Sequence, residues 1–186
     1  GDVENFPFLD PPETKSVNDG YRLLFELGAI DEQRVLTDTG RLMARLPIEP
    51  RFSRILIAAS GSSCLQEAAI IVAGLSIQEP RESPADKRQL AREKHRVYDH
   101  PDSDFLSLVN LWNWFEQSRQ DLARNQLRKL CSRNLLSYNR LIEWRETHRQ
   151  LLALSQHLGL KRNRREADYR ALHTAILSGS LNQLGT

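Results

Sequence analysis

The side chains in this sequence that are best suited to bind a ligand are the arginines of its C-terminal third. Between Arg119 and Arg170 there are 13 Arg or Lys residues against 5 Asp or Glu residues, whereas the rest of the chain holds 13 against 19. The overall charge of +2 therefore hides a basic segment of +8. A guanidinium fork matches phosphate oxygens better than a lysine ammonium does. The pattern indicates polyanion binding, although a basic stretch can also be only a solvated face.

A single long helix is predicted to carry several of these polar groups. Residues 130–151 have the longest helical pattern in the chain, and the helix is expected to end at Gly159. Wound at about 100° per residue, this helix places Asn134, Arg145 and His148 within its apolar side. Unpaired polar groups in such a place are costly, so something must satisfy them.

Catalytic motifs are absent from the sequence. It contains no GxxxxGK[ST] nucleotide loop, no GxSxG elbow, and no HExxH or paired-cysteine spacing for zinc. The acidic stretch Asp99 to Asp104, which includes His100, is interpreted as a helix start rather than a metal loop. We therefore predict no catalytic residue and no metal ligand in the chain.

The composition is that of a soluble globular protein, with 40% hydrophobic and 27% charged residues. The longest apolar run, Ala68 to Leu75, is much shorter than the roughly 20 residues of a membrane span, and the N-terminus has no signal-peptide pattern. Cys64 and Cys131 lie in apolar surroundings and are predicted to be buried free thiols. We expect a cytoplasmic protein that does not bind or span a membrane.

The elements that position these residues are almost all helices. Periodicity and capping residues predict helices over about 10–28, 37–46, 50–61, 62–75, 85–97 and 103–115, then a basic helix after Arg119, the long helix, and a last helix over 169–177. Ser62 or Ser63 is expected to cap the fourth of them. Residues 31–36 form a turn and a short extended piece, so the first unit is either a degenerate winged helix or a plain helical hairpin. The fold class is mostly α, with a helical bundle after the first unit.

Seven short stretches are distinctive enough to compare with known families. The most specific is LTDTGRLMARLPIEP, from Leu36 to Pro50. The others are Phe8–Pro12, Leu27–Asp31, Ser103–Leu106, Cys131–Leu136, Arg149–Leu151 and Leu172–Gly179. In order and spacing, the set resembles the winged-helix and helicase-associated, ratchet-like region of DEAH-box RNA helicases. Glu143, Trp144, Arg145 and His148 are most similar to the bacterial HrpA branch, whereas Asn139 stands where the family usually has arginine.

The resemblance implies a winged-helix domain over residues 1–50 and a ratchet-like helical domain over residues 51–186. It also implies that two RecA-like motor domains, which bind ATP and Mg²⁺, precede Gly1 and that an OB-fold follows Thr186. The chain itself would then hold no cofactor. It would act as a monomeric, noncatalytic segment of an ATP-dependent helicase.

By the same resemblance, the chain forms part of a tunnel for single-stranded RNA and supports strand translocation. Phosphate and sugar contacts would hold the strand, with little base readout. The strand-facing candidates are, first, Arg133, Asn134, Ser137, Tyr138 and Arg145, and second, Arg140 and Arg149. For Arg145, a buried ion pair with Asp104 or another carboxylate of the neighbouring helix is a nearly equal alternative.

Two other classes of function stay open at this point. A winged-helix DNA-binding regulator would read duplex DNA with its second helix, where only Arg41 and Arg45 could contact bases. A helical protein-interaction scaffold would instead dock a partner on the acidic first two-thirds of the chain.

Overall fold

Helices make up nearly all of the regular structure. The computed structural model describes residues 13–180, and within this range the only β-structure is two isolated antiparallel bridges, Ile30 with Leu36 and Arg81 with Leu136. The helices are α1 (Thr14–Glu26), α2 (Asp38–Met43), α3 (Pro50–Gly61), α4 (Leu65–Leu75), α5 (Arg88–His95), α6 (Asp104–Asp121), α7 (Arg124–Arg133), α8 (Tyr138–His157) and α9 (Tyr169–Leu177). The predicted mostly α fold class is confirmed.

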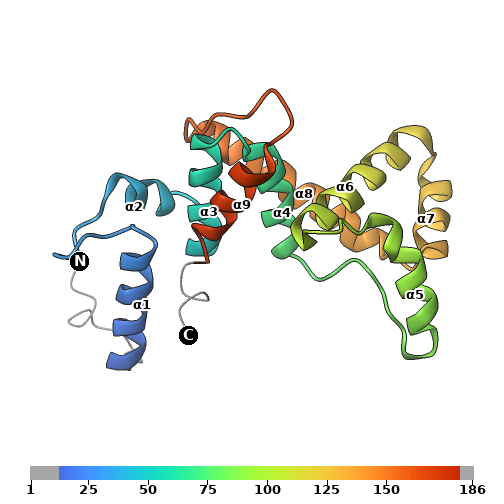
Figure 1. The fold of residues 1–186 in the computed structure, drawn as a ribbon, viewed down its shortest axis with the longest axis horizontal. Coiled ribbons are helices and arrows are strands. Elements are labelled where there is room, and N and C mark those ends of the chain that lie inside the picture. Colours follow the sequence, from blue (N-terminus) through green and yellow to red (C-terminus); the bar gives the residue numbers. More distant parts are fainter. Residues whose placement is uncertain (1–12, 181–186) are drawn as a thin grey trace.

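The helices lie in three groups along the long axis of the molecule (Figure 1). α1 and α2 form one end, α3, α4 and α9 form the middle, and α5, α6 and α7 form the other end. α8 runs between the last two groups, so its two ends belong to different surfaces.

Two glycines and a threonine stabilise the turns that connect α1 and α2 in the first unit of the chain. Gly28, directly after the end of α1, has a φ of +67°, a conformation that glycine adopts at little cost. The Thr37 hydroxyl donates to the Gly28 carbonyl oxygen at 2.6 Å and accepts from the Gly40 N–H at 3.0 Å, which caps α2. A Cβ on Gly40 would lie 1.9 Å from the carbonyl oxygen of Ala29. With its single β-bridge in the wing, the unit is a degenerate winged helix, and the plain hairpin is excluded.

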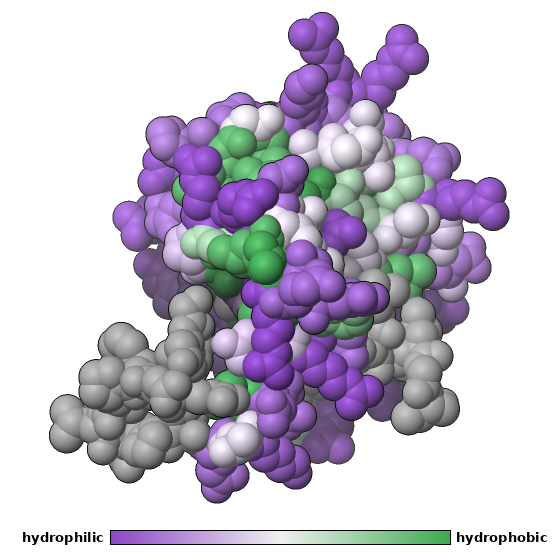
Figure 2. Space-filling model, turned by 90° about the vertical axis from the view of Figure 1, so that its left-hand side faces the viewer, coloured by the Kyte–Doolittle hydropathy of each residue, from purple (hydrophilic) through white to green (hydrophobic). Residues whose placement is uncertain are grey.

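The surface at this end of the molecule is mostly hydrophilic, with small, separated apolar patches (Figure 2). The unit exposes the large apolar side chains of Phe25, Val35 and Leu36. No helix within residues 13–180 is long and apolar enough to cross a membrane.

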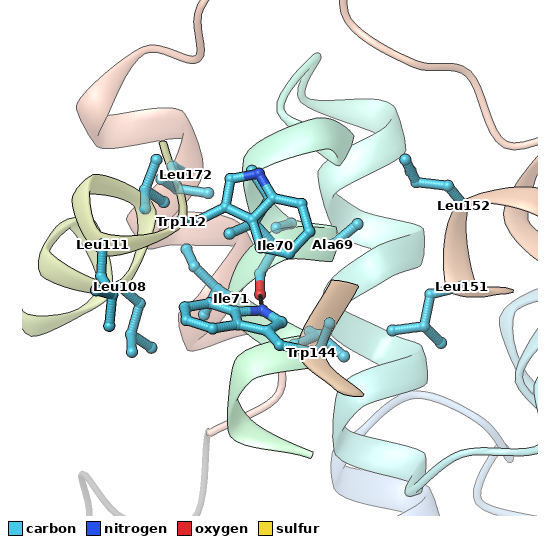
Figure 3. Packing of buried hydrophobic residues seen from close by; sticks show 14 of the residues in the cluster. Ala69, Ile70, Ile71, Leu108, Leu111, Trp112, Trp144, Leu151, Leu152 and Leu172 are labelled. Atoms are coloured by element: carbon cyan, nitrogen blue, oxygen red, sulfur yellow. Dashed lines mark hydrogen bonds between the residues drawn. The ribbon is translucent and has the colours of Figure 1, made fainter. Parts of the chain in front are cut away.

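The core forms around α4, which is buried along nearly its whole length and packs against α3, α6, α8 and α9. Trp144 of α8 is completely buried, and its indole N–H donates to the Ile70 carbonyl oxygen of α4 at 2.8 Å (Figure 3). Gly74, also on α4, leaves room for this indole, because a Cβ there would lie 2.7 Å from the ring atom Cζ2. Trp112 of α6 packs on Trp144 with the ring centroids 5.5 Å apart. One indole therefore joins α4, α6 and α8.

The predicted continuous helix over residues 130–151 is wrong. The chain forms two helices, α7 and α8, with a break between them. Asn134 ends α7, and its side-chain amide donates to the Leu130 carbonyl oxygen at 2.9 Å. Leu135 then takes a φ of +54°, which a helix cannot accommodate. The end of α8 at Gly159, with a φ of +79°, agrees with the prediction.

The break is stabilised by a neighbouring segment that the local pattern could not reveal. The Leu135 carbonyl oxygen accepts from the Glu82 N–H, and the Ser137 N–H donates to the Pro80 carbonyl oxygen, both at 2.8 Å. Leu136, between them, is only 2% exposed. These contacts outweigh the helical propensity of the sequence, and the polar groups expected on one apolar side lie on separate elements.

The predicted serine cap of α4 is also wrong. Cys64 occupies the N-cap position and its side chain makes no capping bond, while Ser63 has a φ of +55°. The side-chain oxygen of Asn163, 97 residues after Gln66, accepts from the Gln66 N–H at 2.9 Å instead. A residue of the α8–α9 loop therefore supplies the cap.

Most other local predictions agree with the structure. α3 and α9 have the predicted bounds, and Ser103 caps α6 by accepting from the Leu106 N–H at 3.2 Å, as expected for a helix start. The predicted 85–97 helix is instead the short α5 between two 3-10 turns, and α6 is longer than predicted. Cys64 and Cys131 are buried free thiols, and burial raises the pKa of each to about 11. The expected first-helix start at Asp10 lies outside the described residues.

Candidate nucleic-acid interface

α7 carries exposed cations on more than one of its sides, here called the α7 row, and no acidic residue. Leu127 and Cys131 are buried on its inner side. The exposed residues of α7 include Arg124, Arg128, Lys129 and Arg133. Within residues 13–180, none of these four cations takes part in an ion pair. Neighbouring uncompensated cations repel one another, so the α7 row is a surface that a polyanion would stabilise.

The junction between α7 and α8 follows directly on the α7 row. The Nε2 of His95 lies 3.1 Å from the Asn134 carbonyl oxygen and 3.0 Å from that of Leu135. Both oxygens can only accept, so Nε2 carries a proton and clamps the junction onto α5. The Arg128 guanidinium lies 5.6 Å from the centroid of the Tyr138 ring, within the range of a cation–π contact.

The junction therefore combines the two kinds of group that hold single-stranded nucleic acid, namely cations for the phosphates and an aromatic ring for stacking. Arg133 is exposed, while Asn134, Ser137 and Tyr138 are half-buried. The Ser137 hydroxyl makes no capping bond to α8, and the Asn134 amide nitrogen is engaged with its own helix. Four of the seven predicted strand-facing residues thus lie at one place.

Arg140 lies on another side of α8. At about 100° per residue it is roughly 140° away from Arg145 and roughly 180° away from Arg149. Its guanidinium donates to the Glu79 carbonyl oxygen at 2.9 Å, which braces the segment before α5. Burial acts to raise the pKa of the Glu79 carboxyl, but hydrogen bonds and charge from Arg81 outweigh it and lower the pKa.

Arg145 forms an ion pair with Glu116 of α6, with its Nε 3.2 Å from Oε1. Of the two alternatives for its partner, Asp104 is therefore wrong and another carboxylate of the neighbouring helix is correct. The Arg145 and Glu116 side chains are 39% and 24% exposed, so the pair is not fully buried. Arg119 holds the same carboxylate at 3.1 and 3.0 Å. Two guanidinium groups share one acid, which leaves a local positive excess.

We expect Arg145→Met to lower the free energy of unfolding by no more than about 1 kcal/mol, because a half-exposed ion pair is weakened by solvent. A double-mutant cycle with Glu116→Gln, measured by urea denaturation, should give a coupling of about 0.5 kcal/mol or more. The matched cycle with Asp104→Asn should give none. Equal coupling in both cycles would rule out Glu116 as the specific partner.

His148 and Arg149 account for the remaining polar groups of α8. The His148 ring packs on Trp112 with centroids 4.5 Å apart. Burial, and then the charge of Arg162, lower the pKa of His148 to about 4, so the ring is neutral at pH 7 and its position on the apolar side costs no charge burial. Arg149 holds Glu146 at 3.1 and 2.6 Å. This pair is largely exposed and can exchange partners easily.

Sequence reasoning missed part of this surface. The sequence predicts Arg124, Arg128 and Lys129 only as members of a basic helix, whereas in the structure they lie on the same helix as the strand-facing candidate Arg133. The signal was present in the sequence, because residues 124–133 contain no acid. The cation–π contact with Tyr138 could not be predicted, since it depends on the break between the two helices.

Two family models match the chain. Residues 21–48 match the winged-helix part of the helicase associated domain (HA2), and residues 49–108 match its ratchet-like part. The matches run from the middle of α1 through α2, and from the start of α3 into α6.

The curated relatives extend the similarity over the whole chain. The ATP-dependent RNA helicase HrpA of Escherichia coli is 43% identical over all of the chain, and its Haemophilus influenzae homolog is 39% identical over 99% of it. The ATP-dependent RNA helicase DHX33 of Drosophila melanogaster is 32% identical over 96% of the chain. The chain spans 15% of the length of each bacterial relative and 25% of the insect one. The chain belongs to the winged-helix and ratchet-like helicase-associated region of DEAH-box RNA helicases, and its similarity to bacterial HrpA proteins extends over nearly its whole length.

Proposed function

We propose that the chain is a noncatalytic segment of an ATP-dependent RNA helicase that lines part of the path of single-stranded RNA and supports translocation. The observation that carries this proposal is the uncompensated α7 row beside Tyr138. The relatives, which are named as RNA helicases, support RNA as the polyanion.

In this proposal, Arg128 and Arg133 contact phosphates, and Tyr138 stacks on a base. The Ser137 hydroxyl can donate to phosphate, and the Asn134 amide oxygen can accept from a ribose hydroxyl. Arg145 and Arg149 lie farther along α8, and their ion pairs with Glu116 and Glu146 can give way to phosphates. Arg140 has a bracing role and is the weakest candidate. Since such contacts read backbone and stacking, binding should depend little on sequence.

The wider assembly follows from the same proposal. ATP and Mg²⁺ would bind in RecA-like motor domains outside this chain, and these domains and an OB-fold would close the RNA path. The chain would act within a monomeric helicase in the cytoplasm and would contribute binding rather than chemistry.

The double variant Arg128→Ser/Arg133→Ser should bind a fluorescent single-stranded RNA about tenfold more weakly than the unaltered chain at low salt. The slope of log affinity against log salt should fall by about 1.4, since each lost phosphate contact removes about 0.7. Tyr138→Ala should weaken binding without changing this slope, because stacking releases no counterions. Fluorescence anisotropy at several salt concentrations measures both effects.

The control is Arg88→Ser/Arg92→Ser on α5, which removes the same charge from exposed positions without ion pairs among the described residues. This variant should retain affinity within about twofold of the unaltered chain. An equal loss in both double variants would mean that only net charge matters. Absence of RNA binding at any salt concentration would favour the protein-interaction scaffold.

The structure disfavours the DNA-binding regulator. α2 has only six residues, and Arg41 is held by Asp38 at 2.7 Å and by the Leu36 carbonyl oxygen at 2.8 Å. One of the two arginines that could read bases is thus already engaged. Duplex DNA bound more tightly than single-stranded RNA of equal length would reverse this conclusion.

A further inference from the structure

The loop between α8 and α9 contains a second group of uncompensated cations. Lys161, Arg162, Arg164 and Arg165 are all exposed, whereas Asn163 in their middle is only 7% exposed. None of the four cations forms an ion pair with another residue of the 13–180 range. Within the described part of the chain, Arg162 is the one cation of the four with a side-chain hydrogen bond, to the Gln66 amide oxygen at 3.4 Å.

The backbone of this loop is fixed although its surface is charged. The Asn163 carbonyl oxygen accepts from the Gln66 side chain at 2.6 Å, and the Asn163 amide donates to Glu67 at 2.8 Å. The Lys161 N–H donates to the Ser60 hydroxyl at 2.8 Å, and the Ala167 N–H donates to Glu67 at 3.1 Å. The cations are therefore held close together on a fixed backbone, and a ligand would not have to order the loop.

The anchoring of the loop does not require these cations. Asn163 makes the anchoring bonds, and the flanking side chains contribute only the weak Arg162 contact. Glu166 adds one exposed negative charge next to four positive ones and pairs with none of them within the described residues. Three of the four cations are arginines, whose fork suits phosphate.

The loop lies away from the α7 row. α8 has 20 residues and is about 30 Å long, with the α7–α8 junction at its start and the loop directly after its end. Figure 1 shows the loop above α3 and α9, in the middle of the molecule, whereas α7 lies at one end. The two basic groups are therefore separate surfaces.

We propose that Lys161, Arg162, Arg164 and Arg165 form a second RNA contact, which binds the phosphate backbone of a part of the strand that has left the α7–α8 junction. This inference rests on the proposed function for the identity of the polyanion. The fixed loop would bind the strand independently of base sequence, about the length of α8 away from the contact at the α7–α8 junction.

The test compares two triple variants that lose the same charge. The loop variant is Lys161→Ser/Arg164→Ser/Arg165→Ser, which retains Asn163 and the Arg162 contact. The control is Lys87→Ser/Arg88→Ser/Arg92→Ser, at exposed positions in and just before α5. Anisotropy is measured with single-stranded RNA of about 30 nucleotides and of about 5 nucleotides, the shorter of which spans only about 17 Å when stacked. Circular dichroism checks that both variants melt at the temperature of the unaltered chain.

For the long strand, the loop variant should lose about tenfold in affinity at low salt, and its salt slope should fall by about 2, while the control changes less than about twofold. The affinity of the loop variant for the short strand should fall far less, because a short strand cannot contact the loop and the α7–α8 junction at once. Equal affinities and slopes of the two variants would overturn the second contact, even if the α7 variants still lose RNA. A loop variant that binds RNA normally but no longer binds polyglutamate would assign the loop to an acidic protein. Failure of the unaltered chain to bind either strand would overturn both this inference and the proposed function.

Discussion

Trp144→Ala should lower the free energy of unfolding by about 3 to 5 kcal/mol. The indole is completely buried between α4, α6 and α8, so its removal leaves a cavity that three helices would have to close. The substitution also leaves the Ile70 carbonyl oxygen without its side-chain donor and removes the packing against Trp112. Urea denaturation followed by circular dichroism measures the loss.

Trp114→Ala is the matched control, because this tryptophan is only partly buried and packs edge-on against Tyr98 at 5.3 Å. Its cost should be clearly smaller than that of Trp144→Ala.

Gly74→Ala adds a second test, since its Cβ would press on the Trp144 indole at 2.7 Å. Gly74→Ala should lower the free energy of unfolding by about 1 to 3 kcal/mol in the unaltered chain. The same change should cost much less in a chain that already carries Trp144→Ala, because the indole no longer fills the space. Additive costs would show that Gly74 does not make room for the indole.

The helix that carries Trp144 could be predicted from the sequence, but the partner of the neighbouring Arg145 could not. The sequence placed Trp144 and Arg145 in a helix correctly, because residues 138–157 contain no glycine or proline and form a long stretch without a helix-breaking residue. It could not reveal which carboxylate faces Arg145, since Glu116 and Asp104 both lie on α6, 12 positions apart. Only the register between α6 and α8 decides between them.

The break between α7 and α8 was beyond local reasoning for a similar physical reason. The sequence through Leu135 and Leu136 has helical periodicity, and no glycine or proline marks a stop. The positive φ of Leu135 is sustained by backbone bonds to the segment 80–82, more than 50 positions earlier. The candidate interface depends on this break, so its residues were predicted while its shape was not. The short turn motifs around Thr37 and Gly40 were easier to interpret, because their bonds are local.

Asn163→Ala should lower the free energy of unfolding by about 2 to 3 kcal/mol, although the residue lies in a loop among five mostly charged positions. The substitution removes the N-cap of α4, worth about 1 kcal/mol, and leaves the Glu67 carboxylate without its amide donor, which adds a cost of similar size or more. Asn139→Ala, at an exposed site with no such bonds, should change stability by less than about 0.5 kcal/mol. Equal values for the two variants would contradict the tertiary cap.

Asn163→Asp separates the cap from the amide bonds. The variant keeps an oxygen for the Gln66 N–H but places a carboxylate where the amide now donates to Glu67 at 2.8 Å. Two carboxylates at this distance raise the pKa of the pair in the folded state, so the penalty should be large at pH 7 and shrink as the pH falls to about 4. Denaturation curves at both pH values measure this recovery, with Asn163→Ala as the variant that should not show it. Because Asn163 makes the cap and lies between two pairs of basic residues, the flanking cations can be removed while the cap of α4 stays in place.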